Sequence, residues 1–256
     1  MQLKDRHILV TGAAKRVGRA IAECLLDPAR GPGVRLTAHY HQSETNARDL
    51  AATLKKRGRE SHLVSADLRD PKALAAAMDS AVARFGPVDI LVNSASAFYP
   101  TPANTVTPAQ WDELLDTNLK GHFFLAQSFH RQLGNRPGVI VNIADVNGEI
   151  GMKRHAPYSA AKGGLLALTR TLALEWAPRV RVNAVSPGPV LLPESYSEAQ
   201  RRRSVERTLL GRVGSASDVA LAVLFLVEND YVTGMNLRVD GGRSLAGHGK
   251  APEEAL

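Results

Sequence analysis

Residues 6–18 read RHILVTGAAKRVG, and this stretch decides the fold. An apolar run leads into a glycine turn, and the chain continues as RAIAECLL, which has helical periodicity. A strand, a glycine turn and a helix in this order can hold a phosphate, because the N–H groups and the dipole at the helix start favour negative charge. One such turn is a weak signal alone, so the rest of the chain must support it.

Strand-like runs alternate with helical patterns along almost the whole chain, which predicts an α/β fold: a doubly wound parallel sheet with helices on both faces. The expected strands are His7–Val10, Arg35–Tyr40, Ser61–Ala66, Ile90–Val92, Val139–Ile143, Arg181–Val185 and Leu237–Val239. Asp70 before Pro71, and Thr107 three residues before Gln110, are typical of helix starts. We expect one domain over residues 1–245 and a flexible tail over 246–256.

Length and composition agree with one large domain. The chain has 256 residues, of which 44% are apolar and 22% charged, enough for a sizeable core. The single cysteine, Cys24, permits no disulfide within the chain, and no signal peptide precedes the first strand, so we expect a reducing, cytoplasmic location. The longest wholly apolar run, Val219–Val227, is too short to span a membrane, and we expect no membrane partner.

The net charge of +7 and the pI of about 9.7 raise the question of a nucleic-acid partner. The basic residues are spread along the chain, and aromatic residues, at 5%, are too few for stacking platforms, so we expect no such partner. The one dense basic cluster, Arg201–Arg203, is interpreted as a solvated helix face, which can also attract anionic substrates.

A second stretch, residues 139–164, carries proton-handling side chains. It reads VIVNIADVNGEIGMKRHAPYSAAKGG: an apolar run, a loop with Asp145, and a helix with Tyr158 and Lys162 one turn apart. Residues four apart share a helix face, so we expect the Lys162 ammonium to lie beside the Tyr158 phenol and lower its pKa. A phenol tuned in this way is a usable general acid near neutral pH.

Taken together, these motifs resemble the short-chain dehydrogenase/reductase family, whose fold is a Rossmann-type domain. The glycine turn, Asn93 to Ser96 after a strand, Asn118 in a middle helix, and Tyr158 with Lys162 occur in the family's order, from about Lys4 to Gly242. The resemblance implies that Tyr158 is the catalytic acid, that Lys162 binds the nicotinamide ribose, and that Asn118 holds a water that relays protons.

The end of the second strand predicts which cofactor is used. Enzymes that select NAD usually place an acidic residue there for the ribose 2′-hydroxyl, but this chain has His41, Gln42 and Ser43. These side chains can donate hydrogen bonds to a 2′-phosphate, and Lys15 and Arg16 add positive charge, so we predict NADPH. The other cofactor contacts that the resemblance implies are Gly12, Val17, Gly18, Asp67, Leu68, Asn93, Ala95, Ser96, Tyr158, Lys162, Pro187 and Gly188.

Arg16 also narrows the resemblance. It stands at the middle glycine of the usual T-G-x-x-x-G-x-G turn, and the T-G-A-A-K-R turn followed by an H-Y-H strand end is similar to the pteridine and dihydromonapterin reductases. In that branch a phenylalanine stacks on the pterin ring, and Phe98 matches its position. The resemblance further implies that Arg16 and Ser96 contact the substrate. Arg16 would also pair with the cofactor diphosphate.

Asp145 stands where most of the family has the serine that polarises a carbonyl. A carboxylate would repel a ketone oxygen that gains charge, so it is a poor replacement for serine in carbonyl reduction. A ring C=N bond has a different requirement, since hydride goes to carbon and a proton must reach nitrogen, and the resemblance implies that Asp145 and Tyr158 deliver that proton.

The sequence therefore favours NADPH-dependent reduction of a pterin, such as dihydrobiopterin, dihydromonapterin or dihydrofolate, without a metal. Two alternatives stay open: a carbonyl reductase, for instance of 3-oxoacyl thioesters, and a non-catalytic dinucleotide-binding protein. The resemblance also implies a homotetramer packed through the helix Ser217–Val227 and the last strand. We expect Pro189–Leu210 to be a mobile substrate lid.

Overall fold

A seven-stranded, fully parallel sheet forms the centre of the computed structural model, which describes residues 1–192 and 196–246. The strand order is β3-β2-β1-β4-β5-β6-β7, so it reverses between β1 and β4, as in a doubly wound sheet. The predicted fold class is confirmed. The strands are β1 (His7–Val10), β2 (Arg35–Tyr40), β3 (Glu60–Ser65), β4 (Ile90–Asn93), β5 (Gly138–Ile143), β6 (Val180–Pro187) and β7 (Asn236–Val239).

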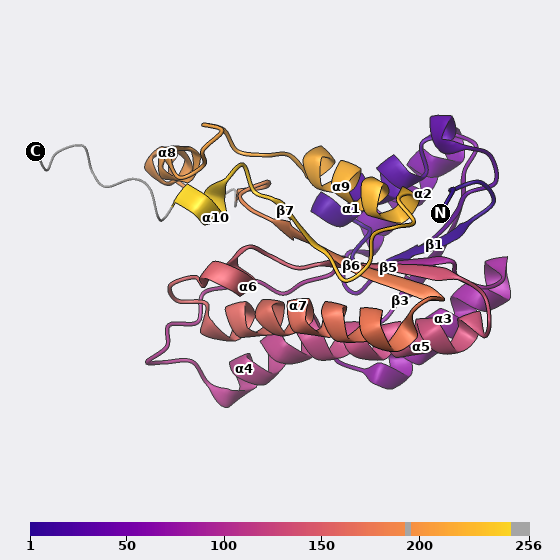
Figure 1. Cartoon of the computed structure of the whole chain (residues 1–256), viewed down its shortest axis with the longest axis horizontal. Coiled ribbons are helices and arrows are strands. Elements are labelled where there is room, and N and C mark those ends of the chain that lie inside the picture. The colour runs from indigo at the N-terminus through magenta and orange to yellow at the C-terminus, as the bar shows by residue number, and fades with distance from the viewer. Residues whose placement is uncertain (193–195, 247–256) are drawn as a thin grey trace, which may run out of the picture.

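Helices cover both faces of this sheet (Figure 1). Helices α1, α2 and α9 pack on one face, and α3, α5 and α7 on the other. The helical elements are α1 (Arg16–Leu25), η1 (Pro28–Arg30), α2 (Glu44–Lys56), α3 (Pro71–Phe85), α4 (Pro108–Leu115), η2 (Asp116–Lys120), α5 (Gly121–Leu133), α6 (Asn147–Ile150), α7 (Ala156–Trp176), α8 (Glu198–Glu206), α9 (Ala216–Glu228) and α10 (Arg243–Ala246). None of the described helices is long and apolar enough to cross a membrane.

The first strand shows how the sheet divides the core. Ile8 and Val10 belong to the cluster under α1, α2 and α9, whereas Leu9 belongs to the cluster under α3, α5 and α7. Successive side chains of a strand point to opposite faces, so a strand buried on both faces carries apolar side chains on both, as Ile8, Leu9 and Val10 do. This is why HILV lacks the alternation of a half-exposed strand.

Local sequence signals place the helix starts. The Asp70 carboxylate accepts hydrogen bonds from the N–H groups of Lys72 and Ala73 at the start of α3. Thr107 and Gln110 form a reciprocal capping box at the start of α4, as predicted. Of the predicted tail 246–256, Ala246 belongs to α10. Residues 247–256 of that tail and residues 193–195 of the predicted lid lie outside the described residues.

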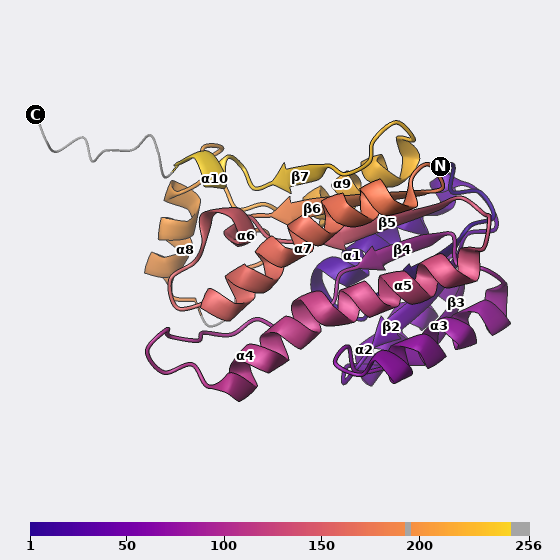
Figure 2. The ribbon, with the colours of Figure 1, turned by 60° about the horizontal axis from the view of Figure 1, so that its bottom comes forward.

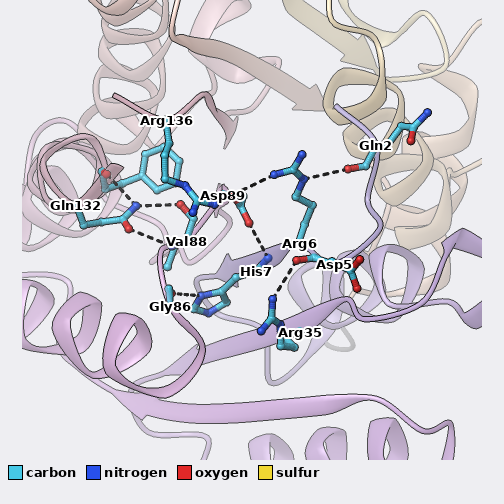
Figure 3. A network of polar contacts seen from close by, with 11 residues as sticks. Gln2, Asp5, Arg6, His7, Arg35, Gly86, Val88, Asp89, Gln132 and Arg136 are labelled. Carbon is cyan, nitrogen blue, oxygen red and sulfur yellow. Dashed lines mark hydrogen bonds and ion pairs between the residues drawn. The ribbon is translucent and has the colours of Figure 1, made fainter. Parts of the chain in front are cut away.

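A polar network ties together the amino ends of the central strands (Figure 3). The buried Asp89 carboxylate accepts hydrogen bonds from the backbone N–H of His7 at 3.0 Å and from the guanidinium groups of Arg136 at 2.7 Å and Arg6 at 3.4 Å. A buried carboxylate requires such partners, because an unpaired one would be costly. The network therefore has a structural role at the amino ends of the strands.

At the opposite edge of the sheet, where the carboxyl ends of the strands lie, α6, α8 and α10 group together (Figure 2).

Candidate active site

A cleft with a volume of about 1010 Å³ opens at the carboxyl ends of the strands. Its walls come from the glycine turn, the ends of β2, β4, β5 and β6, the start of α7 and the segment around α8. The cleft brings together all the predicted site residues except Asn93 and Asn118, which are buried behind it. Among the described residues, no three His, Cys, Asp or Glu side chains are grouped as metal ligands.

The glycine turn is shaped for a close approach to the backbone. Gly12 has a φ of +63°, and a Cβ atom there would lie 2.9 Å from Cα of Ala95. A Cβ atom on Gly18 would lie 2.2 Å from the Gly12 carbonyl oxygen. Helix α1 has no side-chain cap and no acidic residue in its first turn, so its amino end is open to an anion. These features fit the diphosphate of a dinucleotide.

Arg16 occupies the left-handed region of the backbone, with a φ of +56°. The left-handed conformation of a non-glycine residue costs about 1–2 kcal/mol of conformational free energy. This cost explains why the family that the sequence resembles usually has glycine at this position. The Arg16 guanidinium donates a hydrogen bond to the Leu191 carbonyl at 3.0 Å. It thereby connects the glycine turn to the segment that follows β6.

His39 was not predicted as a site residue, yet it positions the glycine turn. Its Nδ1 atom accepts the Gly12 N–H at 3.3 Å, so Nε2 carries the proton and donates to the Ala66 carbonyl at 3.0 Å. Burial lowers the pKa of His39 to about 4, which keeps the ring neutral. In the sequence, the H-Y-H pattern at the end of the second strand was the feature that could have indicated this role of His39.

The predicted 2′-phosphate site contains an ion pair that the sequence did not reveal. Arg69 donates to both carboxylate oxygens of Asp67 at 2.7–3.1 Å, and these bonds lower the pKa of Asp67. The same carboxylate lies 3.9 Å from Nε2 of His41. An acidic group therefore does lie beside the end of β2, but Arg69 neutralises it.

Asp145 and Tyr158 form the chemical centre of the cleft. The Tyr158 hydroxyl donates a hydrogen bond to Oδ2 of Asp145 at 2.7 Å, while Oδ1 accepts the backbone N–H and the side-chain amide of Asn147 at 2.7 and 2.8 Å. Burial, together with the Asp145 charge, raises the pKa of Tyr158 well above its usual value. Burial also raises the pKa of Asp145, despite the bonds that it accepts.

The prediction that Lys162 lowers the pKa of Tyr158 is wrong for this structure. The Lys162 ammonium donates to the Ile143 carbonyl at 2.8 Å and lies 5.8 Å from the centre of the Tyr158 ring. Burial of the phenol and the nearby carboxylate determine the Tyr158 pKa instead. Burial also lowers the pKa of Lys162 to about 8.

Asn118 lies on the π-helical turn η2 and fixes the loop after β4. Its Oδ1 atom accepts the Ser96 hydroxyl at 2.6 Å and the Ala97 N–H at 3.2 Å, and its Nδ2 atom donates to the carbonyls of Ala97 and Leu114. These contacts occupy two donors and two acceptor positions, the full capacity of an amide. The structure thus gives the Asn118 side chain a positioning role, and its predicted role in holding a water stays a prediction.

Two predicted residues from the same region differ in their placement. Ser96 lines the cleft and is among the groups that act on the pKa of Tyr158, in the lowering direction. Asn93 is buried and donates to Oδ1 of Asn142, so it connects β4 to β5 behind the cleft. Asn93 therefore supports the site without lining it.

Phe98 forms an aromatic wall next to Tyr158. Its ring stacks on His155, with centroids 4.7 Å apart, and meets the Tyr158 ring edge-on at 4.9 Å. The side chain is 46% exposed. Phe98 thus presents free aromatic surface to the cleft beside Tyr158, and its ring also stacks on His155, which the sequence did not single out.

Pro187 and Gly188 complete the site at the end of β6. The Pro187 carbonyl accepts the Val146 N–H at 3.2 Å, which ties this turn to the loop that carries Asp145. Gly188 packs so closely on Asp240 that a Cβ atom would lie 2.7 Å from the Asp240 Cβ. Both residues line the cleft, as predicted for contacts to nicotinamide.

Comparisons with known proteins agree with this architecture. Residues 12–244 match a family model described as enoyl-(acyl carrier protein) reductase. The chain is 35% identical to 3beta-hydroxysteroid dehydrogenase 1 of Eggerthella lenta, over 95% of each chain. It is also 35% identical to the 3-oxoacyl-[acyl-carrier-protein] reductase FabG of Salmonella typhimurium, over 94% of this chain and 98% of the relative.

A solved structure gives the same result for the fold. A protein of Sinorhizobium meliloti 1021, assigned as a short-chain alcohol dehydrogenase, superposes with a TM-score of 0.88 at 34% identity. The match covers 94% of this chain and 97% of that one.

Proposed function

The chain belongs to the short-chain dehydrogenase/reductase family of oxidoreductases, and from this premise we propose that it is an NADPH-dependent reductase of pterins. The observation that carries the proposal is the 2.7 Å hydrogen bond from Tyr158 to Asp145. This bond places a proton donor directly beside a carboxylate in the cleft.

The charge of Asp145 also favours a nitrogen over an oxygen. A carbonyl oxygen gains negative charge as hydride reaches its carbon, and a carboxylate nearby opposes that charge. A ring nitrogen that receives a proton gains positive charge, and the same carboxylate stabilises it. Asp145 and Tyr158 would hold the proton for that nitrogen, with Asn147 keeping the carboxylate in place.

The cleft fits the proposed cofactor and ring. NADPH, when bound, supplies the hydride. Gly12, Gly18 and the open start of α1 suit its diphosphate, and Lys15 and His41 suit a 2′-phosphate. The exposed face of Phe98 could hold a flat bicyclic ring, an interaction worth about 1–3 kcal/mol by analogy with base stacking.

The names of the relatives favour a second candidate, a carbonyl reductase of 3-oxoacyl thioesters, since the FabG proteins bear that name. Asp145 argues against it for the charge reason above. Family membership alone does not decide between the two, because one fold hosts many substrates.

One assay separates these candidates. NADPH oxidation is measured with dihydrobiopterin, dihydromonapterin, dihydrofolate and an acetoacetyl thioester at equal concentrations. We expect turnover with at least one pterin and little with the thioester. Turnover of the thioester alone would replace the proposal with carbonyl reduction, and cofactor binding without any turnover would indicate a non-catalytic protein.

We further propose a homotetramer that works in the cytoplasm. The supporting surface is on α9 and the segment around β7, where Leu221, Phe225, Tyr231 and Met235 are 54%, 48%, 99% and 47% exposed. Exposed apolar side chains gathered on consecutive elements are typical of subunit interfaces.

A further inference from the structure

Two arginines, Arg207 and Arg243, line the cleft at its far side from the glycine turn. Arg243 begins α10 directly after β7, the edge strand, and Arg207 follows the end of α8. Both side chains belong to the cleft lining. Neither was named as a site residue, although Arg207 lies within the predicted lid Pro189–Leu210. The predicted basic cluster Arg201–Arg203, by contrast, does not line the cleft.

The backbone around the two arginines is well fixed. The Leu210 N–H donates to the Gly241 carbonyl at 3.1 Å, which fastens the segment after α8 to the turn after β7. In that turn, both Asp240 oxygens are already bonded, one to the N–H of Gly242 at 3.0 Å and the other to the N–H of Ser244 at 2.8 Å. The acidic residue nearest to Arg243 in the sequence therefore serves the backbone.

Arg207 and Arg243 lie close enough for their charges to interact. Burial lowers the pKa of Arg243, and the positive charge of Arg207 adds to this effect. Within residues 1–192 and 196–246, neither has a carboxylate at ion-pair distance, whereas Arg69, Arg136 and Arg238 each pair with one. Two like charges held together without an acid are unfavourable alone and become favourable when an anion binds between them.

We propose that Arg207 and Arg243 form a subsite for an anionic group, a carboxylate or a phosphate, that the substrate carries away from its reacting ring. The sheet order separates this subsite from the cofactor. The predicted phosphate contacts follow β1 and β2, Asp145 follows β5, and Arg243 follows β7, two strands further along. A group that reaches Arg243 from the reacting centre therefore belongs to the substrate.

The subsite deepens the proposed function, on which its choice of substrate rests. Among the pterins, dihydrofolate carries a glutamate tail with two carboxylates, whereas the side chain of dihydrobiopterin is neutral. The two share the reacting ring and differ in the tail. We therefore infer that the enzyme favours pterins with an acidic tail, and that this preference depends on the two arginines.

The test compares Arg207→Gln, Arg243→Gln and the double variant with the matched control Arg202→Gln, which removes the same charge from α8 outside the cleft. With saturating NADPH, each single variant should raise the KM for dihydrofolate roughly tenfold or more, since a hydrogen bond to a charged group contributes about 1.5–3 kcal/mol. The KM for dihydrobiopterin and that for NADPH should change less than about twofold. The control should match the wild type.

Equal KM changes for both pterins, or no change for dihydrofolate, would overturn the subsite while leaving pterin reduction intact. If the wild type reduces neither pterin, the proposed function fails, and the subsite is tested with acetoacetyl-coenzyme A, which carries phosphates, against the neutral acetoacetyl-N-acetylcysteamine. A selective KM rise for the coenzyme A thioester in the variants would then support the subsite; equal KM values would refute it. Unchanged Tm values confirm that the variants are folded.

Discussion

The Tyr158 hydroxyl and the Asp145 carboxylate share a hydrogen bond of 2.7 Å in the middle of the cleft. The two side chains come from different elements, since Asp145 follows β5 and Tyr158 lies in the first turns of α7. Burial favours the protonated form of each group, and the bond holds the phenol proton between them. The pair thus holds a proton that can be transferred. Its net charge is negative as long as Asp145 is ionised.

Deprotonation of Lys162 should limit the activity at alkaline pH. Its pKa of about 8 means that the ammonium loses its charge as the pH rises through that value. We expect kcat/KM for NADPH, which reports the free enzyme, to fall above about pH 8. An activity that stays level to pH 10 in the wild type would contradict a role for the Lys162 charge. A full pH profile at constant ionic strength measures this.

Stability should change in the opposite direction from activity. The folded-state pKa of Lys162 lies below its usual 10.5, so between about pH 8 and 10.5 the unfolded chain holds the proton more tightly, and stability rises with pH. The cost of burying the charge is present in full below this range and amounts to roughly 3 kcal/mol. Urea unfolding at pH 7.5 and 10 should show this gain in the wild type relative to Lys162→Met. Equal pH dependence in both proteins would contradict it.

The ion pair of Arg69 with Asp67 should control the cofactor preference. The wild type should have a KM for NADPH at least about tenfold below that for NADH, a difference of about 1.4 kcal/mol. Arg69→Gln leaves the Asp67 carboxylate unpaired beside His41, so it should raise the KM for NADPH and leave that for NADH nearly unchanged. Arg48→Gln removes an arginine paired with Glu44 on the exposed face of α2 and is the control. Equal wild-type constants for the two cofactors would contradict the NADPH assignment.

Local sequence patterns predicted the strands and helix caps well, because these depend on neighbours in the chain. The strands β1 and β2 have the predicted bounds, and the caps at Asp70 and Thr107 form as expected. Most of the predicted site residues line one cleft, since parallel strands place their carboxyl ends at one edge. Only β6 is clearly longer than predicted, because its pairing with β7 extends to Pro187.

Contacts between distant segments were not predictable in this way. Lys162 shares a helix face with Tyr158, but its ammonium donates to the Ile143 carbonyl at the end of β5. Asn118 matched a family motif, yet the loop after β4 satisfies its whole amide. Arg207 and Arg243 line the same cleft although 36 residues separate them in the sequence, and the segment after α8 bonds to the turn after β7. The hydrophobic periodicity of a sequence does not predict contacts of this kind.

The exposed apolar surface of α9 should disappear in an assembly. Light scattering at micromolar concentration should give the mass of a tetramer for the wild type, and Phe225→Glu should lower it, because a carboxylate would be buried in the interface. Asn46→Glu, which adds the same charge on an exposed position of α2, should not change the mass. A monomeric wild type would contradict the proposed assembly.

Replacing Asp145 tests the substrate class. Asp145→Ser removes the acceptor of the Tyr158 proton and restores the hydroxyl typical of carbonyl reducers in the resembling family. Pterin turnover should fall by about two orders of magnitude or more, because a positioned proton donor contributes about 10²–10⁴-fold. The KM for NADPH should barely change, and any weak ketone activity should stay level or rise, since the repulsive charge is gone. Asp145→Asn, which keeps the shape and an acceptor oxygen but not the charge, should also lose pterin turnover. If Asp145→Ser left pterin reduction intact while Tyr158→Phe abolished it, the carboxylate would have no part in the chemistry, and the pterin assignment would lose its main physical support.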